Sequence, residues 1–450
     1  MKELDFRPAR VRLAHMDPIR ASGQVTDVIG LVIEGNGPGL PIGGICSIHR
    51  RAGHGGNPGR SRGGEGANTV DAEVVGFRKN RVLLMPLGDV SGIEPGNRIV
   101  VGRERPAVGV GDGLLGRVID GLGTPLDGGG PLPVEKYVPL HGRALNPLER
   151  VPIEEPLDLG VRAMNAMITC GRGQRLGIFA GSGVGKSSLL GMIARSTRAQ
   201  VNVIALIGER GREVREFLER DLGEEGRARS VVIVATSDRP PLVRIRGAFL
   251  ATAIAEHFRA GGADVMLMMD SLTRLAMAQR EVGLSIGEPP ASRGYTPSVF
   301  AMLPRLLERA GTTEEGSITG LYTVLVEGDD MNEPIADAAR GLLDGHVVLS
   351  RRLASEGHFP AIDVLSSVSR LMSEIVPAAD VSRANLLRSW LATYRDAEDL
   401  INIGAYNAGS NPRIDEAVAR RPKIEAFLRQ GLHEKCSLEA SFAGLTSVTS

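Results

Sequence analysis

Aromatic residues are scarce in this chain of 450 residues, at 4% of the sequence. The N-terminal part up to residue 100 holds only Phe6 and Phe77, and no tyrosine or tryptophan. Proteins that hold single-stranded nucleic acid stack its bases on aromatic side chains. The shortage therefore counts against an N-terminal domain that binds RNA. The formal net charge is zero, from 53 basic and 53 acidic residues, so bulk charge does not indicate nucleic-acid binding either.

Cysteine and long apolar runs are also lacking. The cysteines, Cys46, Cys170 and Cys436, are far apart and have neither metal-ligand spacing nor the pattern of a disulfide framework, which predicts free thiols. No apolar run is long enough to span a membrane, and residues 1–10 lack the apolar stretch of a secretory signal. These absences predict a cytoplasmic protein, which can still dock on a membrane complex.

The texture of the sequence changes along the chain and predicts three domains. Residues 1–98 alternate short β-branched runs with glycine turns, which is typical of a small β-barrel or sandwich. Residues 99–377 alternate apolar strands with helical patterns and predict a mostly parallel α/β domain, whereas 378–450 predict a small helical domain. A glycine-rich stretch at 52–66 predicts a mobile, solvated insertion, although its arginines also suit an acidic partner.

Individual elements can be predicted within these domains. Apolar runs without alternation predict strands buried on both faces at 201–207, 230–235, 264–269 and 320–326. Apolar residues at helical spacing predict a crossover helix over 241–257. Further helices are expected over 381–397 and 422–432.

The most informative motif is a glycine-rich turn between a predicted strand at 175–179 and a predicted helix from Ser188. Backbone N–H groups in such a turn, together with the N-terminus of the helix, bind phosphate. We expect Lys186 to reach the β- and γ-phosphates of a nucleoside triphosphate and the Ser187 hydroxyl to ligate Mg²⁺. Ala180 stands where the usual motif begins with glycine. The predicted nucleotide-binding residues are Gly181, Ser182, Gly183, Val184, Gly185, Lys186, Ser187 and Ser188.

Two acids follow predicted strands and are expected at the same sheet edge. Asp270 ends the strand at 264–269 and is a candidate for holding Mg²⁺. Glu209 follows the strand at 201–207 and can act as a general base or orient water, although a surface acid explains it equally well. Arg370 is a candidate cation for the transition state, supplied to a neighbouring subunit, but its spacing also suits an ordinary ion pair.

Together these motifs resemble one family, the ATPases of type III secretion, which are related to the catalytic subunit of rotary ATPases. The resemblance covers nearly the whole chain and favours the flagellar export branch. Alanine at position 180 is itself typical of the secretion ATPases. The runs that carry the resemblance are 113–123, 178–187, 208–214, 291–300, 327–330 and 360–370.

The resemblance implies roles for individual residues. It supports the phosphate and Mg²⁺ roles given above for Lys186 and Ser187, and it implies that Glu209 activates water and that Asp270 supports the metal. It adds that Arg210 contacts the γ-phosphate, that Phe359 stacks on adenine, and that Arg370 is an arginine finger for the neighbouring site.

The resemblance also implies a fold, an assembly and a setting. The expected fold has an N-terminal β-barrel, a RecA-like core and a helical C-terminal domain. A homohexamer would couple ATP hydrolysis to docking, unfolding and export of flagellar proteins. Expected partners are a stator-like regulatory protein at the N-terminal domain, a coiled-coil stalk protein in the pore, a membrane export gate, and export substrates with their chaperones. The ring would be cytoplasmic and peripheral at the inner-membrane export apparatus.

Three alternatives remain at this point. A virulence (injectisome) secretion ATPase shares the core motifs, and neither the glycine-rich insertion at 53–66 nor the arginines at 7, 10 and 12 decide between the two systems. A non-catalytic subunit of a rotary ATPase resembles this chain but carries glutamine where Glu209 stands. An RNA-translocating RecA-type hexamer lacks support because the N-terminal aromatic platforms are missing.

Overall fold

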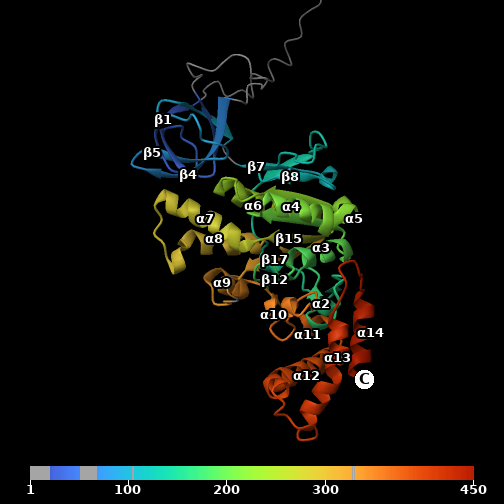
Figure 1. Cartoon of the computed structure of the whole chain (residues 1–450). Coiled ribbons are helices and arrows are strands. Elements are labelled where there is room, and N and C mark those ends of the chain that lie inside the picture. Colours follow the sequence, from blue (N-terminus) through green and yellow to red (C-terminus); the bar gives the residue numbers. More distant parts are fainter. Residues whose placement is uncertain (1–20, 51–67, 104–105, 327, 329) are drawn as a thin grey trace, which may run out of the picture. The chain divides into compact units, whose positions relative to one another are not determined.

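The structure is a computed structural model that describes residues 21–50, 68–103, 106–326, 328 and 330–450 (Figure 1). The predicted insertion at 52–66 and the N-terminal stretch 1–10 lie outside these residues. The chain separates into two compact units, of which the first holds residues up to Pro106 with 285–287 and the second holds the rest. The domain divisions at 98 and 377 stay predictions.

The first unit is a closed β-barrel. Within the described residues its strands are ordered β1-β2-β5-β4-β3-β6. Their bounds are β1 Ser22–Ile29, β2 Val32–Asn36, β3 Ile45–His49, β4 Thr69–Arg78, β5 Arg81–Pro86 and β6 Arg98–Arg103. The buried core includes Cys46 and Ile48 on β3 and Val82 and Leu84 on β5, so alternate positions of these strands face inward. The sequence left a barrel and a sandwich open, and the closed ring of strands decides for the barrel.

Tight turns explain where the barrel strands break. Strands β1 and β2 form a hairpin in which Gly30 turns the chain with a φ of 59°. Between β4 and β5, Lys79 and Asn80 both have positive φ, of 44° and 68°. This two-residue turn matches the right-handed twist of its flanking strands.

A mostly parallel sheet forms the centre of the second unit. Its strand order is β19-β18-β12-β17-β15-β13-β14-β8, with β16 paired to β17. The bounds are β8 Val118–Asp120, β12 Arg175–Ala180, β13 Val201–Ile207, β14 Ser230–Ala235, β15 Asp264–Asp270, β16 Gly311–Thr312, β17 Ser317–Leu325, β18 Gly345–Leu349 and β19 Val368–Ser369. The strands from β8 to β18 on this path run parallel, whereas β16 and β19 pair antiparallel. The carboxyl ends of the parallel strands therefore share one edge.

Helices link these strands (Figure 1). The helices are α2 Arg162–Met167, α3 Lys186–Ser196, α4 Gly211–Glu216, α5 Gly223–Ala228, α6 Pro241–Ala260, α7 Leu272–Ile286, α8 Pro297–Leu307, α9 Pro334–Leu342, α10 Arg351–Ser355 and α11 Met372–Ile375. A π-helical turn, η4, spans Phe217–Leu222. Small two-stranded sheets join β7 Ala107–Val110 to β9 Lys136–Pro139, and β10 Pro156–Leu157 to β11 Cys170–Gly171. The short 3-10 turns are η2 Asp112–Leu114, η3 Pro147–Glu149 and η5 Ser292–Gly294.

The chain ends in three helices, α12 Ala378–Asn402, α13 Pro412–Leu428 and α14 Leu438–Thr449. Leu387, Ile424 and Leu445 from these helices belong to the same hydrophobic core as Met164 and Met167 of α2. Burial of this shared apolar surface therefore attaches the C-terminal helices firmly to the sheet unit.

Most predicted elements are confirmed, and one is corrected. The runs at 201–207 and 230–235 coincide with β13 and β14, and the predicted crossover helix is α6. The helix predicted over 422–432 begins ten residues earlier, at Pro412, because Asn411 caps it by accepting a hydrogen bond from the Arg413 N–H. Helix α14 was not predicted. The three cysteines are free and buried, and within the described residues no helix combines the length and apolarity needed to cross a membrane.

Candidate active site

The phosphate loop connects β12 to α3 as the sequence predicts. Gly183 and Gly185 have φ values of 79° and 91°, which side chains other than glycine rarely adopt. Gly185 precedes α3 directly and accepts the hydrogen bond from the Leu189 N–H at 3.0 Å. Val184 is buried, which fixes the loop onto the sheet. The turn thus presents its N–H groups and the α3 N-terminus to one small volume.

Lys186, Asp270 and Glu209 meet at the carboxyl edge of the sheet. The Lys186 ammonium forms an ion pair with Asp270 Oδ1, and its Nζ lies 3.6 Å from Glu209 Oε1. Asp270 is 3% exposed and Glu209 is 7% exposed. The three side chains come from three segments that end or follow β12, β13 and β15, so the parallel topology brings them together.

Glu209 carries a strongly perturbed carboxyl group. Burial, followed by the negative charge of Asp270, raises the pKa of Glu209 to about 7, against the opposing charges of Lys186 and Arg274. Its Oε1 atom is buried and accepts no hydrogen bond from the described part of the chain. A carboxylate whose pKa lies near neutrality is well suited to accept a proton from water.

Phe359 lies beside the phosphate loop although it is far away in the sequence. A carbon built at the Cβ position of Gly185 would lie 3.7 Å from two ring carbons of Phe359. The ring is 48% exposed, which is unusual for a phenylalanine. Its neighbour His358 is buried, and the Phe359 carbonyl accepts a hydrogen bond from the Gln430 N–H at 2.9 Å. The backbone is therefore anchored while the ring face stays open.

Two predicted site residues have other contacts in this structure. Arg210 directly precedes α4, and its exposed side chain lies 3.5 Å from Glu213 rather than beside Lys186. The Ser188 side chain is partly buried and interacts with the Asp221 carboxyl group. Ser182 and Ser187, by contrast, are exposed at the loop and the first turn of α3.

The Arg370 backbone lies at the amino ends of the parallel strands, opposite the carboxyl edge that carries the phosphate loop. Its N–H donates to the Asp344 carbonyl at 3.0 Å, and Asp344 precedes β18 directly. The Asp344 N–H in turn donates to the carbonyl of Arg175, the first residue of β12. Six residues of β12 at about 3.3 Å each separate this position from the phosphate loop by about 20 Å. Arg370 is thus too distant to serve the site of its own chain.

Comparisons with known proteins agree with this architecture. Residues 25–101 match the β-barrel domain of the ATP synthase alpha/beta family, and 160–369 match its nucleotide-binding domain. Residues 376–447 match the T3SS EscN ATPase C-terminal domain. A flagellum-specific ATP synthase of Bacillus subtilis (strain 168) is 53% identical over 439 residues, which is 96% of each chain. The chain is an ATPase of the type III secretion family.

Two further relatives of this secretion ATPase are informative. A type 3 secretion system ATPase of Xanthomonas euvesicatoria is 50% identical over 431 residues, covering 96% of this chain and 94% of that one. The solved structure of the assembled ATPase EscN with its central stalk EscO, from enteropathogenic E. coli, matches with a TM-score of 0.85 at 43% identity. That match covers 95% of this chain and 100% of EscN. The predicted family, ATPase activity and fold are therefore confirmed, with the barrel, RecA-like core and helical domain all present.

Sequence reasoning missed two polar residues of the secretion ATPase's site. Arg274, on α7, lies 3.3 Å from Glu209 Oε2 and also hydrogen-bonds to the Gly208 carbonyl. Thr323, on β17, donates to Asp270 Oδ1 at 2.7 Å. The sequence did contain a signal for Arg274: it stands four residues after Asp270, and a residue at that spacing falls in the first turn of the helix that follows the strand. Thr323 carried no signal, since a threonine inside an apolar strand is ordinary.

Proposed function

We propose that this ATPase hydrolyses ATP at the Lys186–Asp270–Glu209 cluster to drive export of flagellar proteins. The observation that carries the proposal is the buried Glu209 carboxylate 3.6 Å from the phosphate-loop lysine. The lysine would leave its carboxylate partners to bind the β- and γ-phosphates. Glu209 would then accept a proton from the attacking water, and Arg210, which is exposed and close to Glu209 in the sequence, would turn toward the γ-phosphate.

The residues present fit a Mg²⁺ ion that arrives with ATP. Within the described residues, no cluster of three or more His, Cys, Asp or Glu side chains is arranged to hold a metal alone. Mg²⁺ in such sites is bound through one or two carboxylates together with substrate phosphates. The Ser187 hydroxyl and the Asp270 carboxylate would hold it, and Glu209 Oε1 is a buried acceptor without a hydrogen bond. The ion would neutralise charge on the phosphates.

Adenine and backbone contacts complete the proposed nucleotide site. The open face of Phe359 beside Gly185 suits stacking on adenine. Backbone N–H groups of the loop from Gly181 to Ser188 would hold the phosphates. The Ser188 hydroxyl, engaged with Asp221, would take no part in this binding.

The placement of Arg370 supports a ring in which sites form between subunits. Its side chain is exposed, and the backbone position that carries it is about 20 Å from the phosphate loop of its own chain by strand length. An arginine supplied in trans stabilises the charge of the transferring phosphoryl group. We therefore infer a homohexamer around a coiled-coil stalk, supported by the similarity to the assembled EscN–EscO complex. The stator-like protein, the export gate, the substrates with chaperones and a cytoplasmic place at the inner membrane remain part of this proposal.

Swimming tests the flagellar assignment. Cells that lack this chain should not build filaments, and the wild-type chain should restore them, whereas Lys186→Ala should not. The alternative, a role in a virulence secretion system, needs this test because the chain is 53% identical to a flagellum-specific relative and 50% identical to a type 3 secretion relative. Normal swimming in the deletion strain, together with loss of injectisome secretion, would contradict the flagellar assignment and leave the ATPase site intact.

A further inference from the structure

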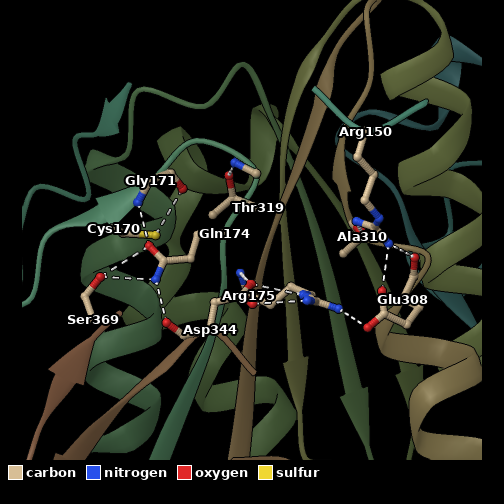
Figure 2. Close-up of polar contacts among 11 residues, drawn as sticks. Arg150, Cys170, Gly171, Gln174, Arg175, Glu308, Ala310, Thr319, Asp344 and Ser369 are labelled. Atoms are coloured by element: carbon tan, nitrogen blue, oxygen red, sulfur yellow. Dashed lines mark hydrogen bonds and ion pairs between the residues drawn. The ribbon is translucent and has the colours of Figure 1, made fainter. Parts of the chain in front are cut away.

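A buried polar network holds the backbone that leads into Arg370. Figure 2 shows Gln174 between Ser369 and Asp344, and Arg175 between Asp344 and Glu308. The Gln174 side chain is fully buried, and its Nε2 donates to the Asp344 carbonyl at 2.9 Å and to Ser369 Oγ at 3.1 Å. The Asp344 carbonyl therefore accepts two hydrogen bonds, one from Gln174 and one from the Arg370 N–H.

The Asp344 side chain fixes this carbonyl to the first residue of β12. Its Oδ2 accepts from the N–H and the Nε of Arg175, at 3.0 and 3.1 Å, and its Oδ1 accepts from a guanidinium nitrogen at 3.1 Å. Such a two-pronged contact constrains orientation as well as distance. Asp344 thus cannot rotate without breaking three hydrogen bonds to one arginine.

The strand that carries Ser369 lies unusually close to β18. Gly345 pairs with Ser369, and a Cβ atom at Gly345 would lie 2.5 Å from the Val368 carbonyl oxygen. Only glycine permits this approach, so β19 has one closely defined position. Beyond it the Arg370 side chain makes a hydrogen bond to the Arg340 carbonyl at 3.2 Å and is otherwise exposed.

We propose that Asp344, Gln174 and Ser369 are positioning residues that hold the Arg370 backbone so that its guanidinium meets the phosphates in the neighbouring subunit. This inference rests on the proposed role of Arg370 in trans. None of the three residues would touch ATP, and all three act through Arg370. The network that holds the Arg370 backbone is buried and hydrogen-bonded, whereas the Arg370 side chain is exposed. This arrangement suits a side chain that must extend from a rigid backbone position into another subunit.

The first test is a double-mutant cycle on kcat for ATP in assembled rings. Asp344→Asn keeps the shape of the side chain but replaces one of the two oxygens that accept hydrogen bonds from Arg175 with an NH₂ group, which can only donate. A displacement of about 1 Å costs on the order of 100-fold in rate, and we expect a loss of that order with little change in KM. In an Arg370→Ala background the same substitution should cost less than about 2-fold, because the group it positions is gone.

Two further variants make the cycle decisive. Ser369→Ala removes the hydroxyl that accepts a hydrogen bond from Gln174 Nε2 and donates one to Gln174 Oε1, and leaves Asp344 and Arg175 untouched. It should lower kcat by less than Asp344→Asn does, and in the Arg370→Ala background its effect should also disappear. Glu308→Gln removes a carboxylate from the other side of Arg175, where Oε1 pairs with that guanidinium, and it should leave kcat unchanged. If Asp344→Asn fails to assemble, Ser369→Ala alone answers the question.

Mixed rings show which site is damaged. Asp344→Asn subunits combined with Lys186→Ala subunits should regain activity, since the Lys186→Ala subunits still present an anchored Arg370. Equal losses in both backgrounds, or no recovery in verified mixed rings when Arg370→Ala subunits do recover, would overturn the positioning role. If Arg370→Ala itself leaves kcat unchanged, the proposed function in trans fails instead.

Discussion

Glu209 Oε1 lies 3.6 Å from Lys186 Nζ, in a site where both side chains are largely withdrawn from water. The same lysine is paired with Asp270, so one ammonium group faces two carboxylates. Burial, followed by the negative charge of Asp270, raises the pKa of Glu209 to about 7. Binding of a triphosphate would draw Lys186 away and leave Glu209 facing the new anion.

Glu209→Gln should keep ATP binding and lose hydrolysis. The amide has the size of the carboxyl group but cannot accept the proton of the attacking water, so we expect kcat to fall by about 10²- to 10⁴-fold. Nucleotide binding by titration calorimetry and steady-state turnover separate the two effects. Glu216→Gln is the matched control, since Glu216 is an exposed acid paired with Arg212 on α4. Loss of ATP binding in Glu209→Gln would make Glu209 structural.

The pH dependence of kcat/KM should show the titration of Glu209. Its carboxyl group must be ionised to act as a base, so activity should rise as pH increases through about 7. Arg274 lowers the pKa of Glu209 through its positive charge, and Arg274→Gln should therefore move this rise to higher pH. Arg212→Gln, at an exposed arginine of α4, should leave it in place. A profile that is flat through pH 7 would contradict the role of Glu209 as the base.

Phe359→Ala should weaken ATP binding. Stacking of a base on an aromatic ring contributes about 1–3 kcal/mol, which corresponds to a loss of roughly 5- to 150-fold in affinity. Phe359→Tyr keeps the ring and should bind ATP almost normally. Inorganic triphosphate lacks adenine, so its inhibition constant should be the same for both variants. Equal weakening of ATP and triphosphate by Phe359→Ala would mean that the ring supports the phosphate loop instead.

Much of this fold could be predicted because its strands are buried on both faces. Continuous apolar runs set the bounds of β13 and β14, and the glycines at 183 and 185 marked the phosphate loop before any geometry was known. The carboxyl-edge rule of parallel sheets then placed Asp270 and Glu209 beside Lys186. Local patterns sufficed here because each residue directly ends or follows a strand.

Other features depend on contacts between distant segments, which no local pattern records. The position of Phe359 over Gly185 follows from packing across 174 residues of chain. The start of α13 was missed because Pro422 inside the helix suggested a beginning rather than an interior position, whereas Asn411 supplies the actual cap. The anchoring of Arg370 by Gln174 and Asp344 requires the register of β18 and β19, which only the folded sheet provides.

The central claim is that each active site is completed by a neighbouring subunit. Specific ATPase activity measured against protein concentration, with light scattering on the same samples, tests it most directly. The account predicts low activity per subunit in the monomer and a steep rise that tracks assembly of the ring, because the backbone of Arg370 is anchored about 20 Å from its own phosphate loop by strand length. Full specific activity in a confirmed monomer, independent of concentration, would contradict it.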